Sequence, residues 1–296
     1  MNTHKCVLVA IFSVAAAAFV AAQNAPAAPP AQTANPPARG AAAPVPDTPP
    51  DPIVRPPNGK PLITEDFESG QIDAKKWATH VSGDETIALS KEKVAHGQQA
   101  LKVHYPAGKA GATSWAFLGT MLPPSLRDHY YGRAYMYVSG PAQAHNVYMN
   151  AGTTGFPISD FLEIGFSGGN FMISYQQNAP ADGHPRSETT ARQGVTPMGK
   201  WFCLEWEMMN KPEDRIVLWV DGVLVANKLF TFNPVNARDP NPDAKLSSGL
   251  VPGGFIEYNV GYRAWSRADA NTADIDVYYD DIAIGDKPIG QLAPVR

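Results

Sequence analysis

The chain has 296 residues, with 24 Lys and Arg against 28 Asp and Glu, which gives a formal net charge of −4. This balance excludes the strongly basic surface that a nucleic-acid backbone requires, so we expect no nucleic-acid partner. Of the 28 prolines, 12 lie between residues 23 and 57, and the remaining sequence is long enough for one sizeable core.

The first 22 residues have the pattern of an export signal. Lys5 precedes an uncharged apolar run at residues 7–20, and the small residues Ala21 and Ala22 follow it. The run is shorter than the roughly 20 residues that cross a bilayer, so cleavage leaves no stable membrane span. We predict a signal peptide at residues 1–22 and a secreted or periplasmic protein. The alternative is an uncleaved membrane anchor.

Residues 23–60 are rich in Pro and Ala and contain few large apolar side chains. Such a composition does not offset the entropy cost of ordering the chain, so we predict a disordered, extended linker. Signal cleavage also leaves Cys203 as the single cysteine, which excludes an internal disulfide. We expect a buried, inert thiol there, with intermolecular pairing as the alternative.

Residues 61–290 consist of short runs rich in Val, Ile, Phe, Tyr and Trp, separated by Gly, Pro, Asn and Asp. No long stretch has a 3.6-residue period. This pattern predicts an all-β domain, a sandwich of antiparallel sheets. The predicted strands include residues 86–89, 100–104, 132–138, 146–151, 161–166, 171–176, 201–208, 215–220, 256–265 and 276–284.

The dipeptide Asp221–Gly222 separates the apolar runs 216–220 and 223–226, which predicts a β-hairpin. Two segments rich in Pro, Asp, Asn, Gly and Ser, residues 178–197 and 231–252, are predicted as long loops. Loops of that length are often functional, although plain surface excursions are equally consistent with the pattern.

Alternation along four strands predicts faces that carry polar side chains. The residues that share a face within each strand are Asn146, Tyr148 and Asn150; Glu163 and Ser167; Cys203, Glu205 and Glu207; and Glu257, Asn259, Arg263 and Trp265. If these strands are neighbours in one curved sheet, the faces line a groove for an extended polyhydroxyl chain. The alternative is the ordinary solvated side of an antiparallel sheet. The expected substrate-binding residues are Asn146, Asn150, Glu163, Gln176, Glu205, Asn259 and Trp265.

Seven segments occur in a characteristic order: EDFESGQIDAKKW (65–77), VAHGQQALKV (94–103), YGRAYMYV (131–138), GKWFCLEWEM (199–208), LWVDG (218–222), GYRAWSRADANT (261–272) and VYYDDIAIG (277–285). In this order they resemble the secreted jelly-roll domains related to glucuronan lyase, known from cellulose-induced fungal proteins and grouped as polysaccharide-lyase-like cores. The resemblance implies a concanavalin-like β-jelly roll, action on or binding to an acidic polysaccharide, and a structural calcium ion.

The same resemblance implies which residues bind calcium. They are Glu68 on the first strand, a carbonyl group of His96 or Gly97, Gln99, and Asp280 on the last strand. Ca²⁺ takes about six to eight oxygen ligands, so these groups have to converge from separate segments. The alternative is that Glu68 and Asp280 only cap turns.

A lyase that acts on uronate polymers removes the proton α to a carboxylate and expels the 4-linked sugar. It needs a group that neutralises the carboxylate, a base and an acid. Arg263 or Asn146 is suited to the first role, Tyr148 to acid or base catalysis, and His145 to the base. The structural alternatives are a sugar-stacking ring at Tyr148, an ion pair at Arg263 and an exposed strand-end imidazole at His145.

One departure from the family pattern bears on catalysis. The strand at residues 160–167 has Phe161 and Glu163 where the resemblance implies a catalytic His and Arg. Glu163 would repel a uronate carboxylate at neutral pH. Either the substrate differs, or the chemistry lies on other strands, or the domain only binds.

Glu205 and Glu207 share a face about 7 Å apart, which is a spacing compatible with retaining glycoside hydrolysis. The surrounding sequence lacks the further acidic residue and the flanking aromatics of that motif. The sequence therefore favours an exported, monomeric polysaccharide-lyase-like enzyme that cleaves a uronate-containing glycan by β-elimination. The alternatives are a non-catalytic carbohydrate-binding sandwich on a flexible tether and, more weakly, a glycoside hydrolase.

Overall fold

The structure is a computed structural model, and it describes residues 59–110, 114–140, 145–154, 158, 160–177, 186–211, 213–230, 249–265 and 270–292. For residues 186–193 only the backbone is described. The predicted signal peptide at residues 1–22 and nearly all of the linker at residues 23–60 lie outside these ranges. In the described ranges, no helix is long and apolar enough to cross a membrane.

The described residues form two antiparallel sheets. The eight-stranded sheet has the order β13 (Val223–Leu229), β12 (Arg215–Val220), β11 (Trp201–Met209), β6 (His129–Val138), β15 (Ile275–Gly285), β4 (Ala100–Tyr105) and β3 (Thr86–Ser90), and β1 (Ile63–Glu65) pairs with β15. The seven-stranded sheet has the order β10 (Arg186–Val195), β9 (Asn170–Gln177), β8 (Asp160–Ser167), β7 (Asn146–Gly152), β14 (Glu257–Ala264), β5 (Trp115–Met121) and β2 (Ala78–Ser82). A single 3₁₀ turn, η1 (Pro124–Leu126), is found among the described residues. The predicted all-β sandwich of two antiparallel sheets is therefore confirmed.

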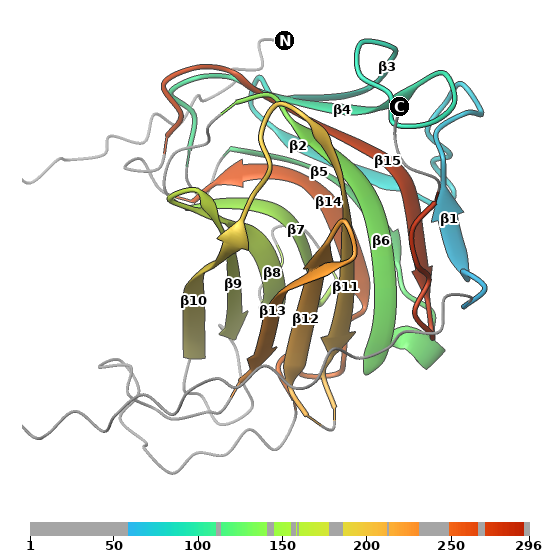
Figure 1. The fold of residues 1–296 in the computed structure, drawn as a ribbon, viewed down its shortest axis with the longest axis vertical. Coiled ribbons are helices and arrows are strands. Elements are labelled where there is room, and N and C mark those ends of the chain that lie inside the picture. The colour runs from blue at the N-terminus through green and yellow to red at the C-terminus, as the bar shows by residue number, and fades with distance from the viewer. Residues whose placement is uncertain are drawn as a thin grey trace, which may run out of the picture. The chain divides into compact units, whose positions relative to one another are not determined.

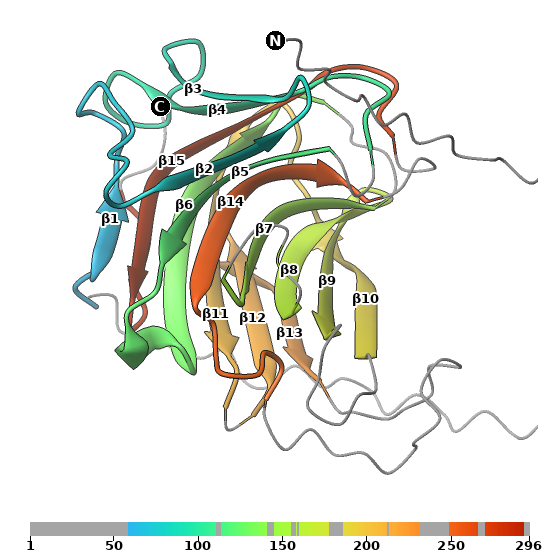
Figure 2. The ribbon, with the colours of Figure 1, turned by 180° about the vertical axis from the view of Figure 1, so that it is seen from behind.

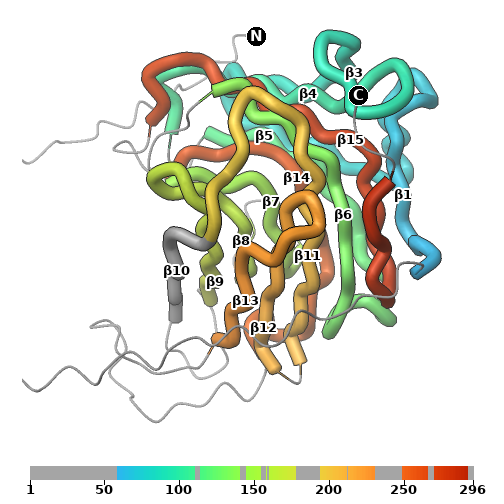
Figure 3. The backbone as a smooth tube through the Cα atoms, in the orientation of Figure 1, coloured from blue at the N-terminus to red at the C-terminus, as the bar shows by residue number. Residues whose placement is uncertain are grey.

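The two sheets stack face to face, with the eight-stranded sheet nearer the viewer in Figure 1 and the seven-stranded sheet nearer in Figure 2. Strands β6, β7 and β14 curve along their length, which the tube in Figure 3 shows for the backbone. Strand β1 pairs with the end of β15, with Ile63 opposite Ile284. The first and last strands are thus neighbours.

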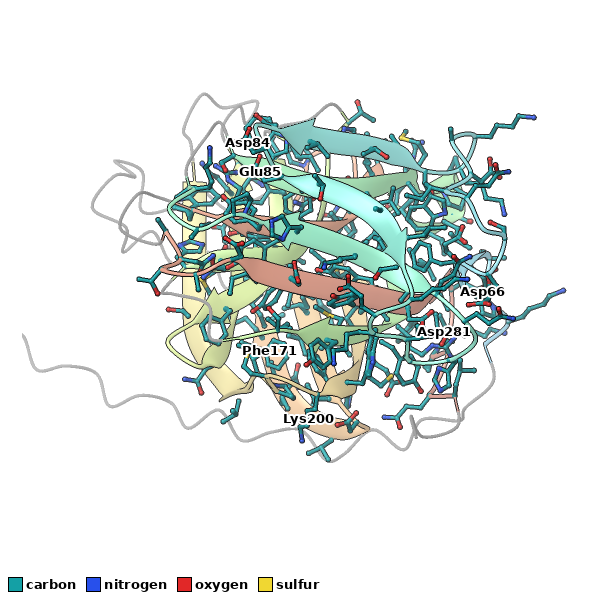
Figure 4. All side chains as sticks on the ribbon, turned by 90° about the horizontal axis from the view of Figure 1, so that it is seen from above. Asp66, Asp84, Glu85, Phe171, Lys200 and Asp281 are labelled. Carbon is teal, nitrogen blue, oxygen red and sulfur yellow. The ribbon has the colours of Figure 1, made fainter. Side chains whose placement is uncertain are left out.

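The core lies between the sheets because each strand turns alternate apolar side chains inward. From the seven-stranded sheet, Leu162 and Ile164 are fully buried in it, and from the eight-stranded sheet Trp206 is 1% exposed. The Trp206 indole stacks on Tyr258 of the opposite sheet, with ring centroids 5.4 Å apart. Figure 4 shows the side chains packed between the layers, Phe171 among them, and Lys200 at the periphery.

Each of the ten predicted strands coincides with an observed strand to within three residues at either end. Strand β10 was predicted as part of the loop 178–197, and that prediction is wrong. Its sequence, RSETTARQGV, has no apolar alternation, and an edge strand that pairs only with β9 does not require one. Of the other predicted loop, residues 231–248 lie outside the described residues.

The predicted hairpin joins β12 to β13 through Asp221 and Gly222, whose φ angles are +50° and +77°. Two successive positive φ angles are typical of the tight turn that Asp-Gly favours. The Asp221 carboxylate also accepts the backbone N–H of Cys203 at 2.9 Å, which ties the turn to β11.

Candidate functional site

Strand β7 contains a β-bulge that reverses the face of its first residues. Val147 lies opposite Gly165 and Met149 lies opposite Ile164, so Tyr148 has no partner on β8. Tyr148 is consequently fully buried in the core. Its hydroxyl group has no hydrogen-bond partner within the described residues, and burial raises its pKa above the ordinary range. The prediction that Tyr148 shares the outward face of Asn150 is therefore wrong, and its role as acid, base or stacking ring stays an untested prediction.

Asn146, which precedes the bulge, also points into the core. Its Oδ1 accepts a hydrogen bond from the Tyr262 hydroxyl at 2.5 Å, and that hydroxyl accepts one from Asn271 Nδ2 at 2.8 Å. Asn146 is 0% exposed. It belongs to a buried polar network, so it does not share the outward face of Asn150 as alternation predicted, and its substrate-binding role stays a prediction.

Beyond the bulge, a straight row of residues crosses the outer face of the seven-stranded sheet. Five residues lie side by side across neighbouring strands, each directly opposite the next. They are Ser174 (β9), Glu163 (β8), Asn150 (β7), Asn259 (β14) and Gly119 (β5). With strands about 4.8 Å apart, the four steps span about 19 Å. We call these five residues the polar row.

Hydrogen bonds link neighbours within the polar row. The Ser174 hydroxyl donates to Glu163 Oε1 at 2.5 Å, and Asn259 Nδ2 donates to Asn150 Oδ1 at 3.1 Å. The four side chains are between 0% and 7% exposed although they point away from the core. The outward direction predicted for Asn150, Glu163 and Asn259 is therefore confirmed, and their burial fixes the geometry of the row.

A second group of side chains gathers beside Glu163. His145 Nε2 lies 3.4 Å from Glu163 Oε1, and the His145 ring stacks on Trp265 with centroids 5.1 Å apart and planes 7° apart. The Arg263 guanidinium lies 4.5 Å from the centre of the same indole. Phe161 meets the Trp265 ring edge-on at 6.2 Å. We call His145, Glu163, Arg263 and Trp265 the His145 cluster.

Arg263 supplies positive charge to this cluster. Burial lowers the pKa of its guanidinium, and the negative charge of Glu163 opposes that effect. Its Nε atom is buried without a hydrogen-bond partner among the described residues. A buried donor without a partner costs free energy, so a ligand oxygen placed there would be stabilised.

At the other end of the polar row, His80 Nε2 lies 2.8 Å from Glu257 Oε1. A Cβ atom on Gly119 would overlap Asn259 Oδ1 and crowd both of these side chains. Glycine therefore permits three polar side chains to lie over its backbone. The Asn259 Oδ1 atom is buried and has no hydrogen-bond partner in the described structure.

Two residues of this face escaped the sequence analysis. His80 lies on β2, whose run ATHVS was not predicted as a strand, so its face was not assigned. Ser174 shares the parity of Gln176 on β9, and that alternation was sufficient to predict it. Gln176 itself lies opposite Phe161, on the predicted face and beside the polar row.

The family can now be decided. The model for the family described as polysaccharide lyase-like, Cip1-like core domain, matches residues 66–287. The chain belongs to this family.

Two solved structures share the fold of this Cip1-like domain. One is the cellulose-induced protein Cip1, with 20% identity over 78% of this chain and 100% of that chain, and a TM-score of 0.54. The other is endo-β-1,4-glucuronan lyase from the fungus Trichoderma reesei, with 15% identity over 80% and 98% of the two chains and a TM-score of 0.56. The predicted jelly-roll sandwich and family resemblance are confirmed. Comparison with curated protein sequences gives no significant match.

In the Cip1-like domain the carboxylates of β11 lie away from the polar row. Strand β11 pairs with β6 and β12 in the eight-stranded sheet, so the prediction that Glu205 shares a groove with Glu163 is wrong. The Glu205 carboxylate accepts a hydrogen bond at Oε2 from Gln291 Nε2 at 3.4 Å. Glu207 accepts hydrogen bonds from His129 and Tyr131, each at 2.8 Å. Neither carboxylate is placed to act with the His145 cluster.

Cys203 is on the same outer face of the eight-stranded sheet. It is a free thiol, 1% exposed, and burial raises its pKa above the ordinary range. These properties match the predicted inert thiol, because a thiol reacts through its accessible thiolate form.

The residues implied as calcium ligands meet at one turn of the Cip1-like domain. Asp280 Oδ2 accepts the backbone N–H groups of residues 95 and 96 at 3.0 and 3.2 Å. Glu68 Oε1 accepts those of residues 98 and 99 at 2.9 and 3.1 Å, and it lies against Gly97. Gln99 Nε2 donates to the carbonyl group of Phe67, and His96 Nδ1 lies 2.5 Å from Asp281 Oδ2.

The oxygen donors at this turn are of the class that calcium prefers. Their arrangement is nonetheless that of a turn cap, because N–H groups rather than carbonyl groups face both carboxylates. The described residues also contain no group of three His, Cys, Asp or Glu side chains placed to hold a metal. The calcium site stays a prediction of the family resemblance, and no step of the function below depends on it.

Proposed function

We propose that this protein binds a uronate-containing polysaccharide across the outer face of the seven-stranded sheet and cleaves it by β-elimination. One observation carries the proposal: the fold brings an imidazole, a guanidinium and an indole together beside a row of buried polar side chains. Membership of a polysaccharide-lyase-like family supports it. The structural neighbour described as a glucuronan lyase supplies the reaction class to test.

Arg263 is the residue suited to the uronate carboxylate. Removal of the proton α to that group places additional negative charge on it in the transition state. A guanidinium fixed against the Trp265 ring stabilises this charge without reorganisation. Glu163 lowers the local positive charge, so the carboxylate has to approach Arg263 from the side away from Glu163.

His145 is the residue suited to act as the base. Its ring is held by stacking on Trp265 and by the contact with Glu163, so its orientation is fixed before substrate binds. The imidazole takes the proton from C5, the C4=C5 double bond forms and the C4–O4 bond breaks. The imidazolium then returns the proton to O4, which becomes the anomeric hydroxyl group of the new reducing end. No other reactant is consumed.

The test measures two products of the same bond cleavage. The protein is incubated with β-1,4-glucuronan, alginate and pectate, and near-ultraviolet absorbance and reducing ends are followed together. Elimination raises both in equal molar amounts, whereas hydrolysis raises reducing ends alone. His145→Ala is expected to lower kcat by about 10²-fold or more. No absorbance change on any of these polymers would contradict the proposal.

A second function, binding without cleavage, is favoured by the position of Tyr148. Because this residue is buried in the core, the described outer face lacks the tyrosine expected as a general acid. Affinity electrophoresis in gels that contain each polymer distinguishes the two functions. Retardation without unsaturated products supports binding alone, and free migration in every gel contradicts both.

A structural calcium ion and export are proposed on the family resemblance and the N-terminal sequence alone. Calcium binding predicts a Tm that rises in calcium and falls in a chelator, and an unchanged Tm contradicts it. Export with cleavage near residue 22 predicts that the protein recovered outside the cytoplasm begins close to Gln23. An intact N-terminus would favour the membrane anchor. Size-exclusion chromatography tests the expected monomer.

A further inference from the structure

The two ends of the polar face differ in charge. At one end, beside Glu163, the Arg263 guanidinium provides a positive charge, since arginine stays protonated in proteins. At the other end the described side chains are Asn259, Glu257 and His80. Asn259 and Arg263 are four positions apart on β14, about 13 Å along the strand. The guanidinium contacts Trp265, which lies farther along the chain from Asn259, so its positive charge is concentrated at the Glu163 end.

The far end presents hydrogen-bond acceptors. Asn259 Nδ2 is used by Asn150, which leaves Asn259 Oδ1 as a buried acceptor with no partner in the described residues. Asn259 is 0% exposed and Glu257 is 5% exposed. Both oxygens lie over the backbone of Gly119, in the space that a Cβ atom would occupy, and Glu257 Oε1 also contacts His80 Nε2 at 2.8 Å. A ligand group that satisfies Asn259 Oδ1 has to be a hydrogen-bond donor.

Sugar hydroxyl groups donate hydrogen bonds, and an ionised uronate carboxylate only accepts them. A carboxylate at Asn259 would leave Oδ1 unsatisfied and would lie beside the negative charge of Glu257. Both effects disfavour a uronate and favour a neutral sugar at this position. We expect a neutral sugar to bind at this position about tenfold more tightly than a uronate, which is the size of effect expected for a single like-charge contact.

We propose that the surface around Gly119, formed by His80, Glu257 and Asn259, is a subsite for an uncharged sugar. The preferred polymer is then one in which uronates are separated by neutral sugars, with the uronate at Arg263 and a neutral unit at Gly119. The inference rests on the function proposed above. It adds a substrate class that neither the family nor the fold assigns.

The experiment uses one backbone at several charge densities. β-1,4-Glucuronan is reduced chemically to different extents, so that a known fraction of its uronates becomes glucose while the linkage is retained. Affinity electrophoresis and kcat/KM are measured across the series at about pH 8, where histidine is ordinarily neutral. Affinity is expected to be highest at intermediate reduction, about tenfold above the unreduced polymer, and to fall again when few uronates remain.

Two variants separate the subsite from general charge effects. Glu257→Gln removes the negative charge and retains a side chain of the same size, so it should move the optimum toward the unreduced polymer. Glu213→Gln is the matched control, because Glu213 is exposed and pairs with Arg215 beside the eight-stranded sheet. It should leave the optimum unchanged.

The outcomes distinguish the two proposals. Binding that is tightest for the unreduced polymer and declines steadily with reduction would overturn the neutral subsite, whether or not cleavage occurs. An optimum in binding without unsaturated products would support the subsite and contradict the lyase. An optimum that Glu257→Gln fails to move would show that the selectivity arises elsewhere.

Discussion

The imidazole of His145 lies parallel to the indole of Trp265, with ring planes 7° apart. The backbone joins them as well, because the backbone N–H of Trp265 donates a hydrogen bond to the backbone carbonyl group of His145 at 3.0 Å. The Arg263 guanidinium contacts the same indole. One aromatic side chain therefore positions both groups that the proposed elimination requires, a base and a cation.

This arrangement predicts a specific pattern for Trp265 variants. Trp265→Ala should lower kcat by about tenfold or more, because His145 and Arg263 lose the surface that orients them. Trp265→Phe retains an aromatic face and should recover most of the rate. Steady-state kinetics on glucuronan separates kcat from KM. A loss confined to KM would show instead that the indole contacts the sugar and positions neither group.

Asp214 is predicted to make stability depend on pH. Burial raises the pKa of its carboxyl group to about 6, despite a hydrogen bond from the Leu250 N–H at 3.1 Å. Because the folded-state pKa exceeds the unfolded one, the stabilising contribution is present below about pH 4 and is lost as pH rises through about 6.

Asp214→Asn removes this titration. Asparagine tolerates the observed φ of +49° and keeps an acceptor for Leu250. At pH 8 the variant should be more stable than the native chain by about 1 kcal/mol, allowing for solvent screening of a half-buried group, and at pH 4 the two should agree. Urea unfolding at both pH values measures the difference. A constant difference would show that Asp214 does not titrate in this range.

Gly132 on β6 is predicted to be required for core packing. A Cβ atom at this position would overlap the Trp206 indole, which is 1% exposed between the sheets. Gly132→Ala should lower the free energy of unfolding by about 1–3 kcal/mol, because the indole has little room to move. Gly140→Ala is the control, since nothing lies within 4 Å of its added Cβ. Equal effects of the two substitutions would refute the steric explanation.

The β12–β13 turn is predicted to depend on the side chain of Asp221. Asp221→Ala should lower the free energy of unfolding by about 1–3 kcal/mol, because it strains a φ of +50° and removes the acceptor for the Cys203 N–H. Asp221→Asn retains both properties and should cost much less. Thermal and urea unfolding measure the series. Similar losses for both variants would mean that the charge, and not the turn geometry, is what stabilises this segment.

Local pattern was sufficient for much of the fold. Short apolar runs marked ten of the strands, and Asp221–Gly222 marked a hairpin, because strand alternation and positive φ angles are properties of a few adjacent residues. Strand β10 was missed because an edge strand can be polar on both sides.

The sequence predicted only part of the candidate site. Alternation placed Glu163, Asn259, Arg263 and Trp265 on outward faces, and the structure brings them to one surface. The bulge at Tyr148 sent that residue and Asn146 into the core, since one unpaired residue reverses every face before it.

The membership of each strand in a sheet was decided by tertiary structure alone. Alternation along β11 correctly separated Glu205 from the apolar side chains, yet it contains nothing that distinguishes one sheet from the other. That choice follows from hydrogen bonding between segments far apart in the chain, which put β11 beside β6 and β7 beside β14. The sequence by itself determined most of the strands, most of their faces and the family, because these are encoded by neighbouring residues and ordered motifs. Only the folded sandwich decided which polar faces meet, because packing of two sheets is a property of the whole domain.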